Sequence, residues 1–316
     1  MRPLRLREIL GLTDQAARQT WLALRGEPGL PGSKFGLSST RLFMPRFAAA
    51  VWRGRNPFGR SVPIVNLVNR TPTPVAQGWS VKVTHVRDFR GRGLTYDSHN
   101  GTDFAIPPGT RVTAAAPGVV VAQRSEYNRG GLKLYIDHGG GLMTSSNHLA
   151  RTLVEVGDVV ARGQVVALSG YSGLDALASF GAVAPHVHFN VYLGGVQVDP
   201  FAADGEVSLW AGECNSPIPA TTRDVDVEPT PFDPNRVAAV LEQLQRARRT
   251  AIAETPRLYE RAWELVIEAN TYPTRFAVPE AARTLFDSAP RSARLSLPFS
   301  AEDYDGVIFA DDVGLR

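Results

Sequence analysis

Short strand-like runs fill the middle of the sequence, from Ala76 to about Pro200. β-Branched or alternating hydrophobic runs recur there between glycines, as RVTAAA, GVVVAQ, LKLYIDHGGG, DVVARGQVVALSG and HVHFNVYLGGVQV. Runs of about 4 to 8 residues with regular turn signals are typical of an antiparallel all-β domain. Gly163, within GDVVARGQVV, stands where a tight hairpin turn would need it. The pattern therefore predicts a β domain over residues 76–205.

Helical spacing replaces this pattern on both sides of the β region. A short helix is predicted over residues 14–24, where it ends before GEPGLPG. Asp233 followed by Pro234 is a capping residue with proline at the first helical position, and valine and leucine then recur at helical spacing. The same signal at residues 255–256 predicts a second helix, and Pro279 opens a shorter third. We therefore expect helical extensions around the β domain.

The length of 316 residues favours two domains, or one domain with substantial extensions. We divide the chain into four parts on these patterns. Residues 1–75 form a basic N-terminal extension of short helices and loops, and residues 76–205 form the β domain. Residues 206–234 are a proline-rich linker, and residues 235–316 are a C-terminal helical region.

Charge is distributed unevenly along the chain. The net charge is +3 overall, but residues 1–95 carry 16 basic and 4 acidic side chains, whereas residues 201–316 carry 12 basic and 19 acidic ones. A basic segment of this kind can attract an anionic polymer or complement an acidic part of the same chain. The arginines are scattered rather than clustered, which favours the second interpretation. No nucleic-acid-binding motif is visible, so we expect no nucleic-acid partner.

Several classes of protein are excluded. No run approaches the roughly 18 to 20 apolar residues needed to span a bilayer, so no transmembrane segment is expected. The N-terminal sequence lacks the continuous apolar stretch of an ordinary secretory signal. The location therefore stays open between the cell envelope and the cytoplasm. A single cysteine, Cys214, can form neither an intrachain disulfide nor a cysteine-based zinc site.

Histidines concentrate in the β region, where five of the six in the chain lie between positions 99 and 188. His186 and His188 are two residues apart, so on a strand both point to one face, about 6.6 Å apart. His99 and Asp103 would lie about 13 Å apart on a straight strand, and Gly101 supplies a residue that tolerates the bend they need. Two imidazoles and one carboxylate with an open fourth position are the ligand set of a catalytic zinc site.

Four segments, in order, carry a resemblance to a known family. They are HNGTDFAIPPGTRVTAAAPGVVV, LKLYIDHGGGLMTSSNHLA, VEVGDVVARGQVVALSGYSG and PHVHFNVYLGGVQVDP, within residues 78–200. This region resembles the lysostaphin-type zinc endopeptidases, the LytM-like peptidoglycan hydrolases. The resemblance implies a mainly β fold, an antiparallel barrel-sandwich hybrid. It also implies one zinc ion (Zn²⁺) as cofactor and the peptide stem or cross-bridge of peptidoglycan as substrate.

The resemblance also assigns roles to individual residues. The H-x3-D motif falls on His99 and Asp103, and the second histidine of the H-x-H motif falls on His188, so these three would bind zinc. The histidine of the H-L motif is His148, and the first of H-x-H is His186. These two would orient the water and stabilise the tetrahedral intermediate. The remaining two histidines are not expected to act in the site. His138 is interpreted as structural, and His85 has no assigned role.

Three positions depart from the family pattern. Ser146 stands where the family commonly has tyrosine, Ala184-Pro185 stands before H-x-H where a glycine is frequent, and Asn190 replaces an acidic residue. None of them is a predicted zinc ligand. All of them are expected to line or flank the substrate groove, so they bear on which bond is cut.

Two other functions, and one additional role for the N-terminal segment, remain open beside the zinc endopeptidase. A LytM-like domain can be a non-catalytic regulator of another hydrolase, although such domains usually lack some of the five site residues kept here. A biotinyl or lipoyl carrier shares the fold class, but Lys133 lies in a strand-like context rather than at a hairpin tip. Finally, the N-terminal segment, residues 1–75, is a candidate intramolecular cover for the groove.

Overall fold

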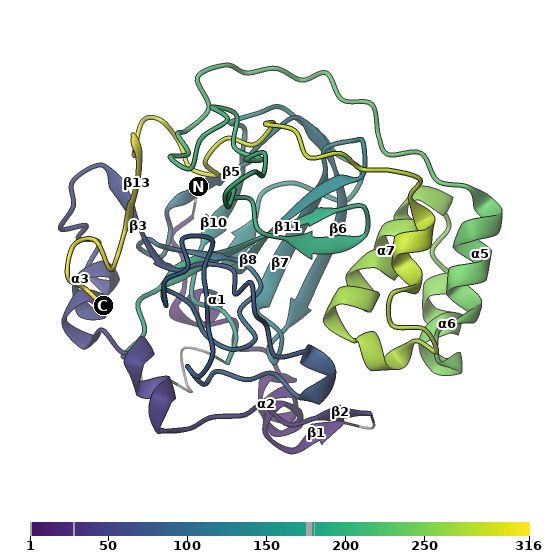
Figure 1. The fold of residues 1–316 in the computed structure, drawn as a ribbon, viewed down its shortest axis with the longest axis horizontal. Helices are drawn as coiled ribbons and strands as arrows, with labels where there is room; N and C mark the ends of the chain where they lie inside the picture. Colours follow the sequence, from purple (N-terminus) through teal and green to yellow (C-terminus); the bar gives the residue numbers. More distant parts are fainter. Residues whose placement is uncertain (1, 28, 175–178, 180) are drawn as a thin grey trace.

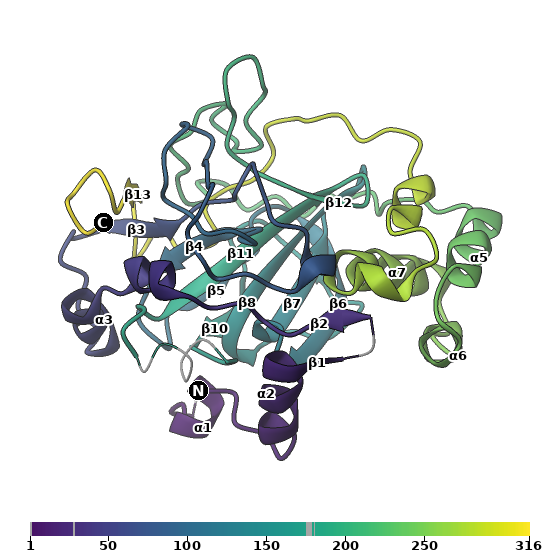
Figure 2. The same ribbon diagram turned by 60° about the horizontal axis from the view of Figure 1, so that its bottom comes forward.

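A large β-sheet with helices on two sides makes up the computed structural model, which describes residues 2–27, 29–174, 179 and 181–316 (Figures 1 and 2). The sheet has 11 strands, and its main path runs β13-β3-β4-β11-β8-β7-β6-β9. Strand β12 pairs with β11, and β10 pairs with both β8 and β5. Among the described residues this path ends at β13 and β9 without closing into a barrel. The prediction of a mainly β fold with helical extensions is confirmed.

The strands of this sheet are β3 (Ser61–Asn66), β4 (Thr102–Ala105), β5 (Arg111–Thr113), β6 (Gly118–Glu126), β7 (Gly131–Asp137), β8 (Leu142–Thr152), β9 (Val159–Val160), β10 (Val165–Ser169), β11 (His186–Leu193), β12 (Val196–Val198) and β13 (Gly306–Phe309). A separate hairpin joins β1 (Gly26–Glu27) and β2 (Leu30–Pro31). Pairing is antiparallel throughout the described strands except between β13 and β3, which run parallel. Gly163, with a φ of +71°, adopts the left-handed conformation in the turn between β9 and β10.

Helices lie before and after the β region. They are α1 (Leu6–Ile9), α2 (Ala16–Arg25), α3 (Pro45–Trp52), α5 (Pro234–Glu242), α6 (Arg246–Ala253) and α7 (Leu258–Thr271), with 3₁₀ helices η1 (Leu37–Leu42), η2 (Val75–Gln77), η3 (Pro273–Arg275) and η4 (Ala281–Leu285). The predicted start at Asp233 is confirmed, since its carboxylate accepts hydrogen bonds from the backbone N–H groups of Asn235 and Arg236. Helix α6 was not predicted.

Both extensions also contribute a strand to the sheet, which the sequence pattern did not predict. Strand β3 belongs to the segment expected to hold only short helices and loops, and β13 belongs to the segment expected to be helical. Pro63 hides β3 because a proline in the middle of a run argues against a strand. Pro63 pairs in register with Ile308 of β13. Strand β13 has four residues, too few to show a clear alternation of hydrophobic and polar positions. The four-part division itself stays a prediction.

Two hydrophobic clusters cover the two faces of the sheet. Along β11 the odd-numbered residues Val187, Phe189 and Val191 belong to the first cluster, with Phe104 and Trp210. The even-numbered Tyr192 belongs to the second cluster, where the C-terminal helices pack against β6, β7 and β8 around the fully buried Trp263. Because side chains alternate along a strand, His186, His188 and Asn190 share the face of Tyr192.

Ion pairs join the basic first third of the chain to later acidic residues. Arg60, Arg90 and Arg92 pair with acidic residues of the last segment, at Asp305, Asp311 and Asp312 respectively. These pairs show that the excess charge of the N-terminal third is at least partly complemented within the chain.

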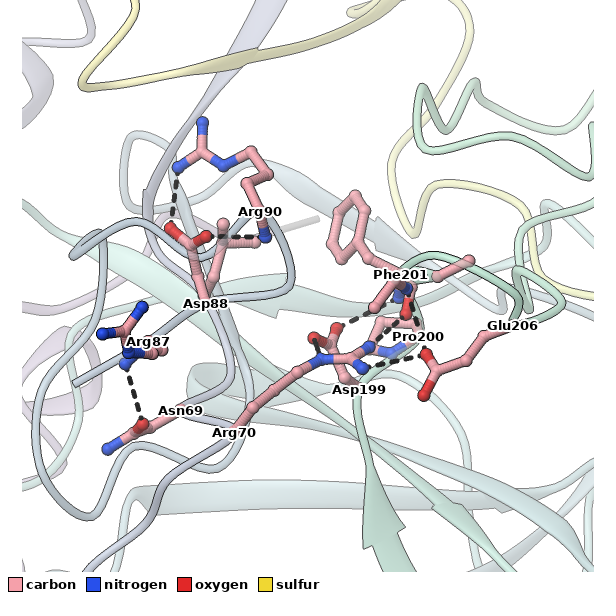
Figure 3. A network of polar contacts seen from close by, with 12 residues as sticks. Asn69, Arg70, Arg87, Asp88, Arg90, Asp199, Pro200, Phe201 and Glu206 are labelled. Carbon is pink, nitrogen blue, oxygen red and sulfur yellow. Dashed lines mark hydrogen bonds and ion pairs between the residues drawn. The ribbon is translucent and has the colours of Figure 1, made fainter.

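Arg70 ties the segment after β3 to the end of the β domain. Its guanidinium donates to Asp199 Oδ2, to Glu206 Oε2 and to the carbonyl oxygen of Phe201, at 2.9, 2.9 and 2.8 Å (Figure 3). Burial raises the pKa of Asp199 to about 6 although Arg70 acts in the opposite direction.

In the part of the chain that the structure describes, no helix is long and apolar enough to cross a membrane.

Candidate active site

Three side chains meet where β4 and β11 pair. Asp103 on β4 stands directly opposite His188 on β11, and His99 lies in the loop just before β4. Asp103 Oδ1 is 2.8 Å from His188 Nδ1, and Asp103 Oδ2 is 3.1 Å from His99 Nε2. The ligand atoms of the three residues lie within 4.8 Å of one another, and all three residues are buried. The chain therefore brings together the carboxylate and the two imidazoles that the sequence predicted.

Gly101 makes this close approach possible. A Cβ atom at this position would lie 2.6 Å from His188 Nε2 and 2.8 Å from the carbonyl oxygen of Phe189. No side chain fits there without displacing β11. The sequence suggested Gly101 for its tolerance of a bend, whereas the structure gives a different reason, which is the lack of space for any larger residue.

Hydrogen bonds on the far side of each ring orient the two imidazoles. His99 Nδ1 bonds to the carbonyl oxygen of Leu67 at 2.6 Å, and His188 Nε2 bonds to Asn100 Oδ1 at 3.1 Å. The ring nitrogens that face Asp103, His99 Nε2 and His188 Nδ1, are those that would bind a metal ion, and the opposite nitrogens are held by the protein. Two imidazole nitrogens and a carboxylate, each with a bonded outer partner, fit the donor set of a zinc ion.

Asp103 is held as an anion by its surroundings. Burial alone would raise the pKa of its carboxyl group, but the three neighbouring imidazoles hold that pKa well below the ordinary value. Asn66 on β3 donates from Nδ2 to Asp103 Oδ2 at 2.7 Å. Arg316 in turn donates to Asn66 Oδ1 at 2.6 Å and to the carbonyl oxygen of Val65 at 2.9 Å. A bulge in β3 between Ile64 and Asn66 aligns Asn66 with Asp103.

Asn190 occupies a place behind His188. Its Nδ2 donates to the backbone carbonyl oxygen of Asn100 at 3.0 Å, and its Oδ1 accepts from Asn147 Nδ2 at 2.8 Å. Asn190 was expected to line or flank the groove, and it does line the pocket that includes His148 and His188. It also belongs to the network around His188, since its Nδ2 is 3.1 Å from His188 Nε2. Asn66, Asn100 and Arg316 were missed by the sequence analysis.

The other two predicted site residues, His148 and His186, lie beside this group. Their ring centroids are 4.7 Å apart, and His186 Nε2 is 3.7 Å from Asp103 Oδ1. His148 sits at an irregularity of the β7–β8 pairing with a φ of +60°, which is uncommon for a residue with a side chain. Its Nδ1 bonds to the carbonyl oxygen of Ser172 at 2.8 Å, as His186 Nδ1 does to that of Ala184.

A pocket adjoins these histidines and includes His148 and His188 in its lining. Its volume is about 100 Å³. Many of the residues that line it are aromatic. They come from the N-terminal segment, from the loops before β4 and β7, and from β7 and β11: Phe35, Trp79, Tyr96, Tyr127, Tyr135 and Tyr192. Ser33 and Val75 of the N-terminal segment also line it.

His138 is engaged in bonds of its own. It is completely buried, its Nδ1 bonds to the carbonyl oxygen of Pro117 and its Nε2 bonds to Thr144 Oγ1, both at 2.9 Å. Burial lowers the pKa of His138 to about 4. An imidazole that is buried, neutral and hydrogen-bonded at both ring nitrogens supports the interpretation that His138 is structural.

The His–Asp–His group on paired strands defines the class of the site, which is a candidate metal centre of histidine and carboxylate ligands. The profile of peptidase family M23 matches residues 97–200, which contain all five predicted site residues. The resemblance of this region to the lysostaphin-type zinc endopeptidases is confirmed by this match.

Curated relatives share this region. The chain is 39% identical over 106 residues to the peptidoglycan DD-endopeptidase ShyA of Vibrio cholerae, which covers 34% of this chain and 23% of ShyA. It is 35% identical over 98 residues to lysostaphin of Staphylococcus simulans, which covers 31% of this chain and 18% of lysostaphin. The chain thus spans less than a quarter of either relative.

Solved structures give similar matches. A zinc-containing peptidase from Vibrio cholerae is 31% identical, with 46% of this chain and 40% of that chain covered and a TM-score of 0.34. The catalytic domain of the M23 protein EnpA from Enterococcus faecalis is 31% identical, with 34% and 81% covered and a TM-score of 0.30.

The depressed pKa of His138 predicts a pH dependence of stability. The unfolded imidazole titrates near 6.5 and the folded one near 4, so the unfolded state binds more protons between these values. We expect stability that is present above pH 6.5 to be lost as the pH falls to 4, by on the order of 3 kcal/mol from this group. Urea unfolding of the wild type and of His138→Gln across this window measures the difference. Parallel curves for the two proteins would contradict the prediction.

Proposed function

We propose that this protein is a zinc-dependent endopeptidase that hydrolyses peptide bonds in the stem or cross-bridge of bacterial peptidoglycan. The observation that carries the proposal is the convergence of His99, Asp103 and His188 next to His148 and His186, within an M23 region. The relatives that share this region include a peptidoglycan DD-endopeptidase. All five residues that the resemblance requires are present and lie together.

His99, Asp103 and His188 would hold the zinc ion through Nε2, the carboxylate and Nδ1. A zinc ion with an open coordination position lowers the pKa of bound water and polarises a peptide carbonyl. In this chain the low pKa of Asp103 keeps the carboxylate charged, and the hydrogen bonds to Leu67 and Asn100 orient the two imidazoles. The ligand set is therefore prepared before any metal arrives.

His148 and His186 would handle protons and developing charge. Because Nδ1 of each ring bonds to a backbone carbonyl oxygen, Nε2 would be the nitrogen that exchanges a proton with water or substrate. Such a nitrogen can accept a proton from an attacking water and then, as an N–H, donate to an oxyanion. The backbone bonds hold both rings in place for that task. The short distance of 4.7 Å between the ring centroids allows both to act on one carbonyl.

Hydrolysis of purified sacculi tests the proposed activity. We expect the zinc-loaded wild type to release soluble muropeptides, and His148→Gln to reduce the rate by about 100-fold or more because proton transfer is lost. The matched control is His85→Gln, because His85 is exposed and outside the site. Mass analysis of the released products identifies the bond.

Absence of release would distinguish the alternatives. If the zinc-loaded wild type binds sacculi but releases nothing, the catalytic proposal is wrong and a non-catalytic regulator becomes the better interpretation. If His148→Gln and His85→Gln release peptides as fast as the wild type, hydrolysis does not take place at this site.

We further propose that Asn66 and Arg316 hold Asp103 in position for the metal. Removing an outer partner of a ligand typically weakens metal affinity by about 10- to 100-fold. We expect a loss in this range for Asn66→Leu and a smaller loss for Arg316→Gln, which leaves the Asn66 amide unrestrained. Competition with a chromogenic chelator measures the zinc dissociation constant.

Arg92→Gln is the control for the zinc measurement. Arg92 pairs with the exposed Asp312 in the same C-terminal segment as Arg316 but contacts neither Asn66 nor Asp103. Its affinity for zinc should equal that of the wild type. Equal affinities in all four proteins would show that Asp103 needs no support from this side.

The N-terminal segment is also proposed to narrow the groove, as an intramolecular cover. Two observations support this: Ser33, Phe35 and Val75 line the pocket beside His148, and its volume of about 100 Å³ is below the roughly 300 to 1,000 Å³ usual for ligand pockets. Deleting the whole of residues 1–75 would also remove β3 and Asn66, so a single side chain is the better probe.

Truncation of Phe35 tests the cover. Phe35 is 43% exposed, so Phe35→Ala should not unfold the chain, and it should raise kcat/KM for muropeptides several-fold by widening the pocket. Phe43→Ala is the control, because Phe43 has a similar exposure of 41% and lies outside the pocket lining. A fall in kcat/KM for Phe35→Ala would mean that Phe35 binds the substrate instead of covering its site.

A further inference from the structure

The described side chains that line the pocket beside His148 carry charge of one sign only. Among the described residues that line it, Arg129 and Lys133 are the charged side chains apart from the histidines, and no aspartate or glutamate is present. The rest of the lining carries no charge and is aromatic, amide, hydroxyl or aliphatic. A pocket of this composition favours an anionic group over a cationic one.

Lys133 is already neutralised by the protein. Its ammonium group forms an ion pair with Glu126 Oε2 at 2.5 Å, and Tyr272 donates its hydroxyl to Glu126 Oε1 at 3.0 Å. Although burial would raise it, the pKa of Glu126 is lowered to about 2 by Lys133 and Arg124. The Glu126 carboxylate is therefore charged at any ordinary pH, and Lys133 has no need of another anion.

Arg129 has no such partner. Its Nη1 donates to the carbonyl oxygen of its neighbour Asn128 at 3.2 Å, and its guanidinium carbon lies 5.6 Å from the ring centroid of Tyr272. Its Nε is buried without a hydrogen-bond partner, and no carboxylate of the described residues forms an ion pair with it. A buried donor that lacks a partner is unfavourable, and an acceptor on a bound ligand would relieve that cost.

Backbone contacts place Arg129 close to the proposed chemistry. The next residue, Gly130, accepts a hydrogen bond from the backbone N–H of His148 at 2.9 Å. Arg129, His148 and His188 all line one pocket. A substrate group bound by Arg129 would therefore lie within the same peptide segment as the bond that is cut.

From these contacts we infer that Arg129 recognises a carboxylate of the peptide substrate and so determines specificity. This inference rests on the proposed endopeptidase function. The planar guanidinium can donate two parallel hydrogen bonds to a carboxylate, a geometry that a lysine cannot reproduce. The ligand is a peptide that carries a free carboxylate near the scissile bond, and its amide counterpart should be a poor substrate.

Kinetics with a matched pair of substrates test the inference. The substrates are cross-linked muropeptides from sacculi, with their carboxylates either free or converted to amides by carbodiimide and ammonia. For the zinc-loaded wild type we expect kcat/KM to be about 10- to 100-fold higher on the acid form. Arg129→Gln should lose this preference mainly through KM, Arg129→Lys should restore part of it, and Arg257→Gln, an exposed control, should behave as the wild type.

Equilibrium binding separates failure of this inference from failure of the proposed function. The His148→Gln protein, with and without Arg129→Gln, is titrated with both muropeptide forms. Tighter binding of the acid form that disappears with Arg129→Gln supports the inference, even if no hydrolysis is found. Equal binding of the two forms, or a preference that survives Arg129→Gln, overturns it even if the protein hydrolyses sacculi.

Discussion

The antiparallel register of β4 against β11 is the constraint on which the site depends. It sets Asp103 opposite His188, and a slip of one residue would turn one of them into the hydrophobic core beside Phe104 and Phe189. The core therefore enforces the register, because the residues that alternate with the site residues are fully buried. Gly101 adds a second restriction, since only a residue without a side chain lets the loop that carries His99 approach β11.

The carboxylate of Asp103 is buried among imidazoles, and residues of both extensions contribute to the hydrogen bonds that hold it. The M23 region supplies Asp103 and the histidines, but Asn66 and Arg316 lie outside residues 97–200. Strands β3 and β13 bring both extensions to the edge of the sheet next to β4. On the other side the C-terminal helices pack against the sheet face that carries the site. The extensions thus form part of the surroundings of the site rather than separate bodies.

The sequence predicted those elements that depend on interactions between residues close together in the chain. Alternation identified the β region, and Asp233-Pro234 identified the start of α5. The family resemblance named the five candidate site residues that the structure brings together. The sequence could not show Asn66 or Arg316, because each acts through a contact between segments far apart in the chain. Strand β3 was hidden by Pro63, and the position of His148 depends on a pairing irregularity that no spacing reveals.

The proposed zinc site can be tested by anomalous diffraction from crystals of the zinc-loaded protein, recorded on both sides of the zinc absorption edge. We expect one zinc peak at about 2.0 to 2.2 Å from His99 Nε2, the Asp103 carboxylate and His188 Nδ1, with His148 and His186 nearby but not bonded to the zinc ion. A peak at other residues, or zinc bound through His148 or His186 in place of Asp103, would contradict the account.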